Sequence, residues 1–169
     1  MVRVTLRAVR VDLQSNTPVL LLQESDGEGR TLPIFIGTPE ATAIAYALQG
    51  VEVPRPLTHD LLVDVIRGLD ATLDKVVVTQ LDGATFFAEL HLSRAGETSV
   101  ISSRPSDAVA LALRTSTPLF VADELMDAEG VLLAIDEEED EDEDGAEEEV
   151  VVDQFREFLD SISPEDFSG

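Results

Sequence analysis

The sequence contains no cysteine among its 169 residues. This absence excludes disulfides and thiolate metal sites, and it is typical of a protein in a reducing compartment. No apolar run approaches the roughly 18 residues that a membrane-spanning helix needs. Residues 1–6 alternate like a strand and lack the basic and apolar segments of a signal peptide. We therefore expect a soluble, cytoplasmic protein that makes no membrane contact.

Basic residues are scarce as well, with 11 Lys and Arg against 35 Asp and Glu, for a net charge of −24. Residues 1–135 hold ten Lys and Arg and 18 Asp and Glu, whereas residues 136–169 hold one Arg and 17 acids. Such a balance argues against broad affinity for a phosphate backbone. Chemistry on nucleic acid would need a local cationic cleft or a bound metal.

The chain has enough apolar residues, 44% of the total, to bury the core of one domain with an extension. Alternating residues predict strands at 2–8, 19–22 and 31–36, separated by turn residues. Thr38 is then predicted to cap a helix that has Pro39 at its first position and ends at Gly50.

A proline-stiffened corner, Pro54–Leu57, follows this helix. Thr58 is predicted to cap the next helix, so that Arg55, His59 and Asp60 are presented close together. The apolar positions of this second helix are predicted to face the core; they are Leu61, Leu62, Val65, Ile66 and Leu69.

Two further strands, 73–81 and 85–92, are predicted to form a hairpin across Asp82-Gly83. A strand at 99–102, a proline-led helix at 104–114, an extended piece at 118–121 and a helical turn at 122–126 complete the pattern. It indicates an α+β fold with a mostly antiparallel sheet and three main helices. The helices beginning near Glu40 and Asp107 share the pattern acid-Ala-x-Ala-aliphatic-Ala. This echo suggests a duplicated strand–strand–helix unit, although two similarly packed helices would also explain it.

Three regions are expected: a domain over 1–132, an acidic disordered linker over 133–149, and an amphipathic helix with its tail over 150–169. A short helix is marginal alone, so we expect it to dock on its own domain, on a sister chain or on a partner. Its apolar residues are Val151, Phe155, Phe158, Leu159 and Ile162.

Several motifs together resemble the bifunctional nuclease (BFN) domain family over residues 1–130: Pro33–Gly37, Glu40-Ala41, the segment 54–62, Thr85-Phe86 and Arg104–Ala108. The segment 155–167 is similar to the tail of actinobacterial members. The resemblance implies an α+β domain, a tendency to form homo-oligomers such as a dimer, and cleavage of DNA and RNA. Family members often carry Asp where this chain has Ser102.

Phosphodiester hydrolysis needs an activated water, neutralisation of phosphoryl charge and protonation of the leaving oxygen. His59 is the candidate general base or acid, and Arg55 and Arg104 are candidate phosphate clamps. Asp60 and Asp107 complete the candidate catalytic set. The candidate ligands for Mg²⁺ or Mn²⁺ are Glu40, Asp60 and Asp107.

A structural interpretation of the same residues stays open. Acids in a first helical turn complement the helix dipole, and a helix N-terminus favours a phosphate over a cation. The arginines would then form ion pairs that join helices, and His91, on a strand with Glu89, would be a surface residue.

These observations leave two main functional hypotheses. The first is a metal-assisted nuclease acting on DNA or RNA. The alternative is a non-catalytic, homo-oligomeric binding or regulatory module that recognises a small anion or a protein partner. A third hypothesis is that the acidic tail mimics nucleic acid and occludes a basic cleft.

Overall fold

The computed structural model describes residues 1–132. The expected linker and C-terminal helix therefore lie outside the described residues. The described chain forms seven strands and four helices in the order β1 (Val2–Asp12), β2 (Thr17–Glu24), β3 (Thr31–Phe35), α1 (Thr38–Leu48), α2 (Thr58–Gly68), β4 (Thr72–Asp82), β5 (Thr85–Arg94), β6 (Glu97–Ser103), α3 (Pro105–Thr115), β7 (Leu119–Val121) and α4 (Asp123–Glu129). The predicted α+β class is confirmed, and α4 lies where the helical turn was expected.

All seven strands form one sheet in the order β3-β2-β1-β7-β4-β5-β6. Every neighbouring pair is antiparallel except β4 and β7. The sheet thus consists of two three-stranded meanders joined through β7. Each meander is followed by a helix, α1 or α3, so the strand–strand–helix pattern occurs twice. That this pattern arose by duplication stays a prediction.

The hairpin predicted across Asp82-Gly83 is confirmed, because Asp82 pairs with Thr85 around a two-residue turn. Gly83 has φ 61°, a left-handed conformation that glycine adopts without strain. Beyond the turn, β5 alternates as predicted, and Ala88, Leu90 and Leu92 are buried in the main core.

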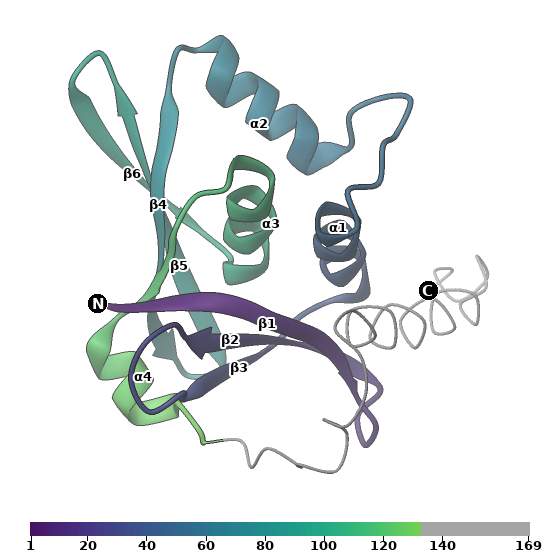
Figure 1. Ribbon diagram of the computed structural model, residues 1–169, viewed down its shortest axis with the longest axis vertical. Coiled ribbons are helices and arrows are strands. Elements are labelled where there is room, and N and C mark those ends of the chain that lie inside the picture. Colours follow the sequence, from purple (N-terminus) through teal and green to yellow (C-terminus); the bar gives the residue numbers. More distant parts are fainter. Residues whose placement is uncertain (133–169) are drawn as a thin grey trace.

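Helix α3 lies at the centre of that core. Residues Ala108–Ala112 are at most 2% exposed, and the helix contacts α1, α2, β4 and β5 (Figure 1). Its alanines let these neighbours approach closely. As a result, the N-terminal turns of α1 and α2 lie beside α3, which positions the polar cluster described below.

The predicted core face of α2 is wrong except at Ile66, which is partly buried against the core. Val63 is the residue of α2 that is buried, whereas Leu61 is 56% exposed, Val65 46% and Leu69 53%. The physical reason is that His59 and Asp60 bond to α3, so the helix packs on α3 along a polar and narrow edge. As a result, the apolar residues Leu61, Val65 and Leu69 point away from the core and are exposed. Leu48, the last residue of α1, is likewise 53% exposed.

The predicted helix caps are also shifted. Gly37 and Leu57 occupy the N-cap positions, one residue before Thr38 and Thr58. At α2 the carboxylate of Asp60 accepts the backbone N–H of Leu57 at 2.9 Å, so the helix begins earlier than the threonine predicts.

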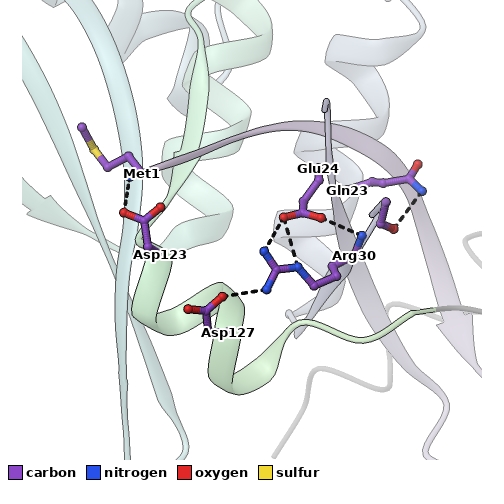
Figure 2. Close-up of polar contacts among 7 residues, drawn as sticks. Met1, Gln23, Glu24, Arg30, Asp123 and Asp127 are labelled. Carbon is purple, nitrogen blue, oxygen red and sulfur yellow. Dashed lines mark hydrogen bonds and ion pairs between the residues drawn. The ribbon is translucent and has the colours of Figure 1, made fainter. Parts of the chain in front are cut away.

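Helix α4 is held against the first meander by ion pairs (Figure 2). Arg30 donates to Glu24 at 2.7 Å and to Asp127 at 2.7 Å, and the amino group of Met1 pairs with Asp123. These contacts fix the end of the described chain beside β3, where Val131 bonds to Thr31. No helix within residues 1–132 is long and apolar enough to cross a membrane.

Candidate functional site

The three acids singled out from the sequence occupy equivalent places. Glu40, Asp60 and Asp107 are each the third residue of a helix, in α1, α2 and α3. Negative charge is favoured there, because the first backbone N–H groups of a helix lack partners and carry partial positive charge. The fold therefore gathers three helix N-termini, each with its own carboxylate.

Arg104 connects two of these carboxylates. Its Nε and Nη2 donate to Asp107 at 2.7 and 3.0 Å, and its Nη1 donates to Glu40 at 2.7 Å. Hydrogen bonds to Asp107 and then to Glu40 raise the pKa of Arg104, so it stays charged. The side chain is still 63% exposed. Three of its five N–H groups are used, which leaves two for an anion from solvent.

His59 joins the same cluster from α2. Its Nε2 lies 3.0 Å from Oδ1 of Asp107, and the imidazole is 13% exposed. With the Nε2 proton directed at the carboxylate, Nδ1 is the nitrogen that accepts a proton. Burial raises the pKa of Asp107, but hydrogen bonds from Arg104 and His59 outweigh it and bring the pKa below its ordinary value.

Asp60 points away from this cluster, although it follows His59 directly. Nε of Arg114 donates to Asp60 at 2.5 Å, and this hydrogen bond is the main reason why the pKa of Asp60 is lowered. Arg114 was missed from the sequence. The signal was available, because Arg114 follows Asp107 by seven residues and so lies on the same face of α3.

Gly37 makes room for one member of the cluster. A Cβ atom at this position would lie 2.3 Å from Oε2 of Glu40, so the carboxylate folds back over its own N-cap. With a side chain at this position, the flexible end of Glu40, whose other oxygen binds Arg104, would have to shift.

The remaining predicted residues are not brought together. Arg55 is exposed and forms no ion pair within residues 1–132. The proposed metal ligands do not fit a common ion: Asp60 binds Arg114, whereas Glu40 and Asp107 share Arg104. In the described part of the chain, no three His, Asp or Glu side chains converge as a metal site.

Two other residues noted in the sequence lie on the opposite face of the sheet. Ser102 is the register partner of Glu89, and Glu89 lies 3.1 Å from His91. The neighbours of Glu89 along β5, Ala88 and Leu90, face the core that contains α3. His91 is thus separated by the sheet from the Arg104 cluster.

A hollow of about 250 Å³ opens beside the cluster, on the Asp60 side. It lies between the end of α1 and the start of α2, and neither His59 nor Arg104 lines it. The lining residues are Tyr46, Ala47, Gly50, Val51, Leu57, Asp60 and Arg114.

Comparison with known proteins assigns the chain to a family. An uncharacterized protein of Mycobacterium tuberculosis is 46% identical over 161 residues, which cover 95% of this chain and 94% of that relative. Bifunctional nuclease 2 of Arabidopsis thaliana is 30% identical over 115 residues, covering 66% of this chain and 35% of the plant protein. The family model of the bifunctional nuclease domain matches residues 20–134. The chain therefore belongs to the bifunctional nuclease domain family.

Proposed function

We propose that the protein is a nuclease that hydrolyses phosphodiester bonds of DNA or RNA at the cluster of His59, Asp107 and Arg104. The observation that carries the proposal is the pair of contacts on one carboxylate. Asp107 accepts from His59 at 3.0 Å and from Arg104 at 2.7 Å. Family membership supports the same activity, because the plant relatives are named bifunctional nucleases.

Each group has a chemical task in this proposal. Asp107 orients the imidazole and stabilises it when it becomes charged. Nδ1 of His59 accepts a proton from water as the water oxygen attacks phosphorus. The same proton is then available to the oxygen that leaves when the P–O bond breaks. The two free N–H groups of Arg104 stabilise the negative charge on the phosphoryl oxygens.

The two histidines of the chain provide a matched test. We expect His59→Gln to lower the cleavage rate of single-stranded DNA and RNA by about 10²–10⁴-fold, the usual contribution of a general acid–base group. His91→Gln is the control, because His91 lies on the other face of the sheet. Equal cleavage by the two variants would point to a contaminating nuclease and reject the site.

Metal dependence is a separate prediction. Glu40, Asp60 and Asp107 do not converge on a shared metal ion in the described part of the chain. The proposed reaction steps therefore use only the side chains of the protein. The assay should compare Mg²⁺, Mn²⁺ and excess EDTA with the same protein preparation. Loss of cleavage in EDTA, restored by one of the two ions, would support the prediction of a metal cofactor.

The ion pairs of the three carboxylates favour a second candidate function, that of a non-catalytic binding module. Glu40, Asp60 and Asp107 all have arginine partners, as expected of a lattice that joins helices in a non-catalytic binding module. Such a module would bind a small anion at the free N–H groups of Arg104. Inorganic phosphate should then raise the melting temperature of the wild type more than that of Arg104→Ala, without any cleavage.

Homo-oligomerisation and a cytoplasmic location also stay predictions. The mass of the full chain in solution, measured by light scattering across a concentration series, tests the first. A mass equal to 18.3 kDa at all concentrations would reject an oligomer.

A further inference from the structure

Four apolar side chains form an exposed row along α2. Leu57, Leu61, Val65 and Leu69 follow one another at intervals of four residues, and they are 40%, 56%, 46% and 53% exposed. Residues four apart stack on one side of a helix. This set, called the apolar row below, spans about 18 Å at the rise of an α-helix. Contiguous apolar surface of this kind marks an interaction site.

The row begins at the hollow described above. Leu57 lines the hollow together with Tyr46, Ala47 and Val51 from the end of α1. The volume of about 250 Å³ is large enough for one aromatic side chain. A partner that matches this surface has an apolar stripe of about three helical turns, and an aromatic residue in that stripe could enter the hollow.

The C-terminal part of the same chain has this pattern. Residues 151–162 carry apolar residues at intervals of three and four, which predict a helical stripe about 17 Å long. Its length matches that of the apolar row, and it includes Phe155 and Phe158. The mycobacterial relative aligns over 161 residues of 169, so the similarity extends into this segment.

The linker is long enough for the segment to reach α2 of its own domain. The described chain ends near α4, at the other end of the molecule from α2 (Figure 1). A compact domain of this size has a diameter of about 36 Å. Residues 133–150 can span up to about 60 Å when extended, and their repeated acids favour an extended chain.

Two exposed arginines offer ion-pair partners near the ends of the apolar row, beside the exposed acids Asp64 and Asp70. Arg55 and Arg67 lie two residues before the first and last members of the apolar row, and neither forms an ion pair within residues 1–132. The predicted polar face of residues 151–162 carries Asp153, Glu157 and Asp160. A docked helix would place these acids beside exposed arginines.

We propose that residues 151–162 dock as a helix along the apolar row of their own domain, with a phenylalanine in the hollow. The contact would cover the exposed face of α2 and the end of α1. The proposal is independent of catalysis, since it needs no activity at His59.

Hydrogen exchange on the full chain tests the contact. In Phe155→Ser/Phe158→Ser we expect amide exchange in residues 46–51 and 61–69 to rise roughly tenfold or more, because each lost phenylalanine weakens docking by at least that factor. The matched control, Asp153→Ser/Asp160→Ser, changes the predicted polar face and should raise exchange much less. Unchanged exchange in β4 and β5 confirms that the variant is folded. Unchanged exchange in residues 46–51 and 61–69 would overturn the proposal.

Engineered cysteines distinguish the same chain from a second copy, since the protein has none of its own. We expect Leu61→Cys to form a disulfide with Phe155→Cys, Phe158→Cys or Leu159→Cys within one chain on mild oxidation. Leu13→Cys is the control, because Leu13 is 94% exposed in the loop between β1 and β2. Disulfides found only between two chains would assign the surface to a second copy and overturn the proposal. Equal yields at Leu61 and Leu13, or none at either, would also overturn it.

Discussion

At the residue scale, Gly37 shows how one missing side chain shapes the polar cluster. The space beside its Cα holds Oε2 of Glu40, and the other oxygen of that carboxylate binds Arg104. The cluster thus depends on a backbone position as well as on charged groups. A methyl group at this position would displace Glu40 without altering any charge.

We therefore predict that Gly37→Ala lowers the free energy of unfolding by about 1 kcal/mol, because alanine is a poor N-cap and the exposed Glu40–Arg104 pair is lost. Gly68→Ala is the matched control, since a Cβ there meets nothing within 4 Å and alanine favours a helix. It should leave stability unchanged or raise it by up to about 1 kcal/mol. Urea denaturation measures both, and equal effects would contradict the steric argument.

Asp107 gives a pH-dependent prediction. Because its pKa in the folded protein lies below the ordinary 3.8, the unfolded chain binds more protons in this range. The contribution of Asp107 to stability is therefore present above pH 3.8 and is lost as the pH falls below it. We expect the unfolding free energies of wild type and Asp107→Asn to differ at neutral pH and to converge in acid. Parallel curves between about pH 6 and pH 3 would reject this cause.

Much of the polar cluster could be predicted from the residue types, but its pairings could not. Arg104, Asp107 and His59 were grouped correctly, because a proline-led helix and a proline-stiffened corner both place side chains at helix starts. Which carboxylate meets which arginine depends on how the helices cross. The seven-residue spacing places Arg114 on the same face of α3 as Asp107, but only the crossing of α2 and α3 makes Asp60 its partner.

At the element scale, α2 is attached mainly by its N-terminal turn and by one buried side chain. Its side-chain bonds to α3 come from His59 and Asp60, and Val63 is buried in the core, while the apolar row is exposed. Periodicity placed Leu61, Val65 and Leu69 on one face of a helix, but the prediction that this face meets the core is wrong. It could not show which surface covers the face, because that depends on the rotation of α2 about its axis.

This arrangement predicts unequal effects of two truncations on α2. Val63→Ala should lower the free energy of unfolding by about 1–2 kcal/mol, because it leaves a gap in the core beside α3. Leu61→Ala, at a side chain that is 56% exposed among the described residues, should lower it by less than Val63→Ala. Thermal or urea unfolding of the two variants measures the difference. A larger effect at Leu61 would contradict the observed rotation of the helix.

The pairing of the strands was easier to predict from the sequence than the packing of the helices. Turn residues such as Asp82-Gly83 specify a hairpin locally, and alternation along β5 specifies its buried face. The joining of the two meanders through β7 was not predicted, because residues 119–121 are too few to show a pattern. Their position depends on two strands that are more than 40 residues away in the chain.

At the scale of the whole molecule, the net charge of −24 opposes the approach of nucleic acid. We predict that cleavage at low substrate concentration becomes severalfold faster between about 0.01 and 0.1 M salt, because the Debye length falls from about 30 to 10 Å. Basic nucleases show the reverse trend. Replacing the nine acids of 136–144 by Asn and Gln should flatten the salt dependence. A rate that falls with salt in both proteins would contradict this prediction.

The central place of β7 has a consequence for how the protein is made. β1 and β4 have no hydrogen bonds with each other, and both pair with β7. Until residue 121 has left the ribosome, the chain lacks the strand that joins its two three-stranded meanders into one sheet. The halves can join only when translation of the domain is almost complete, so the final closure of the sheet is a late event in biosynthesis.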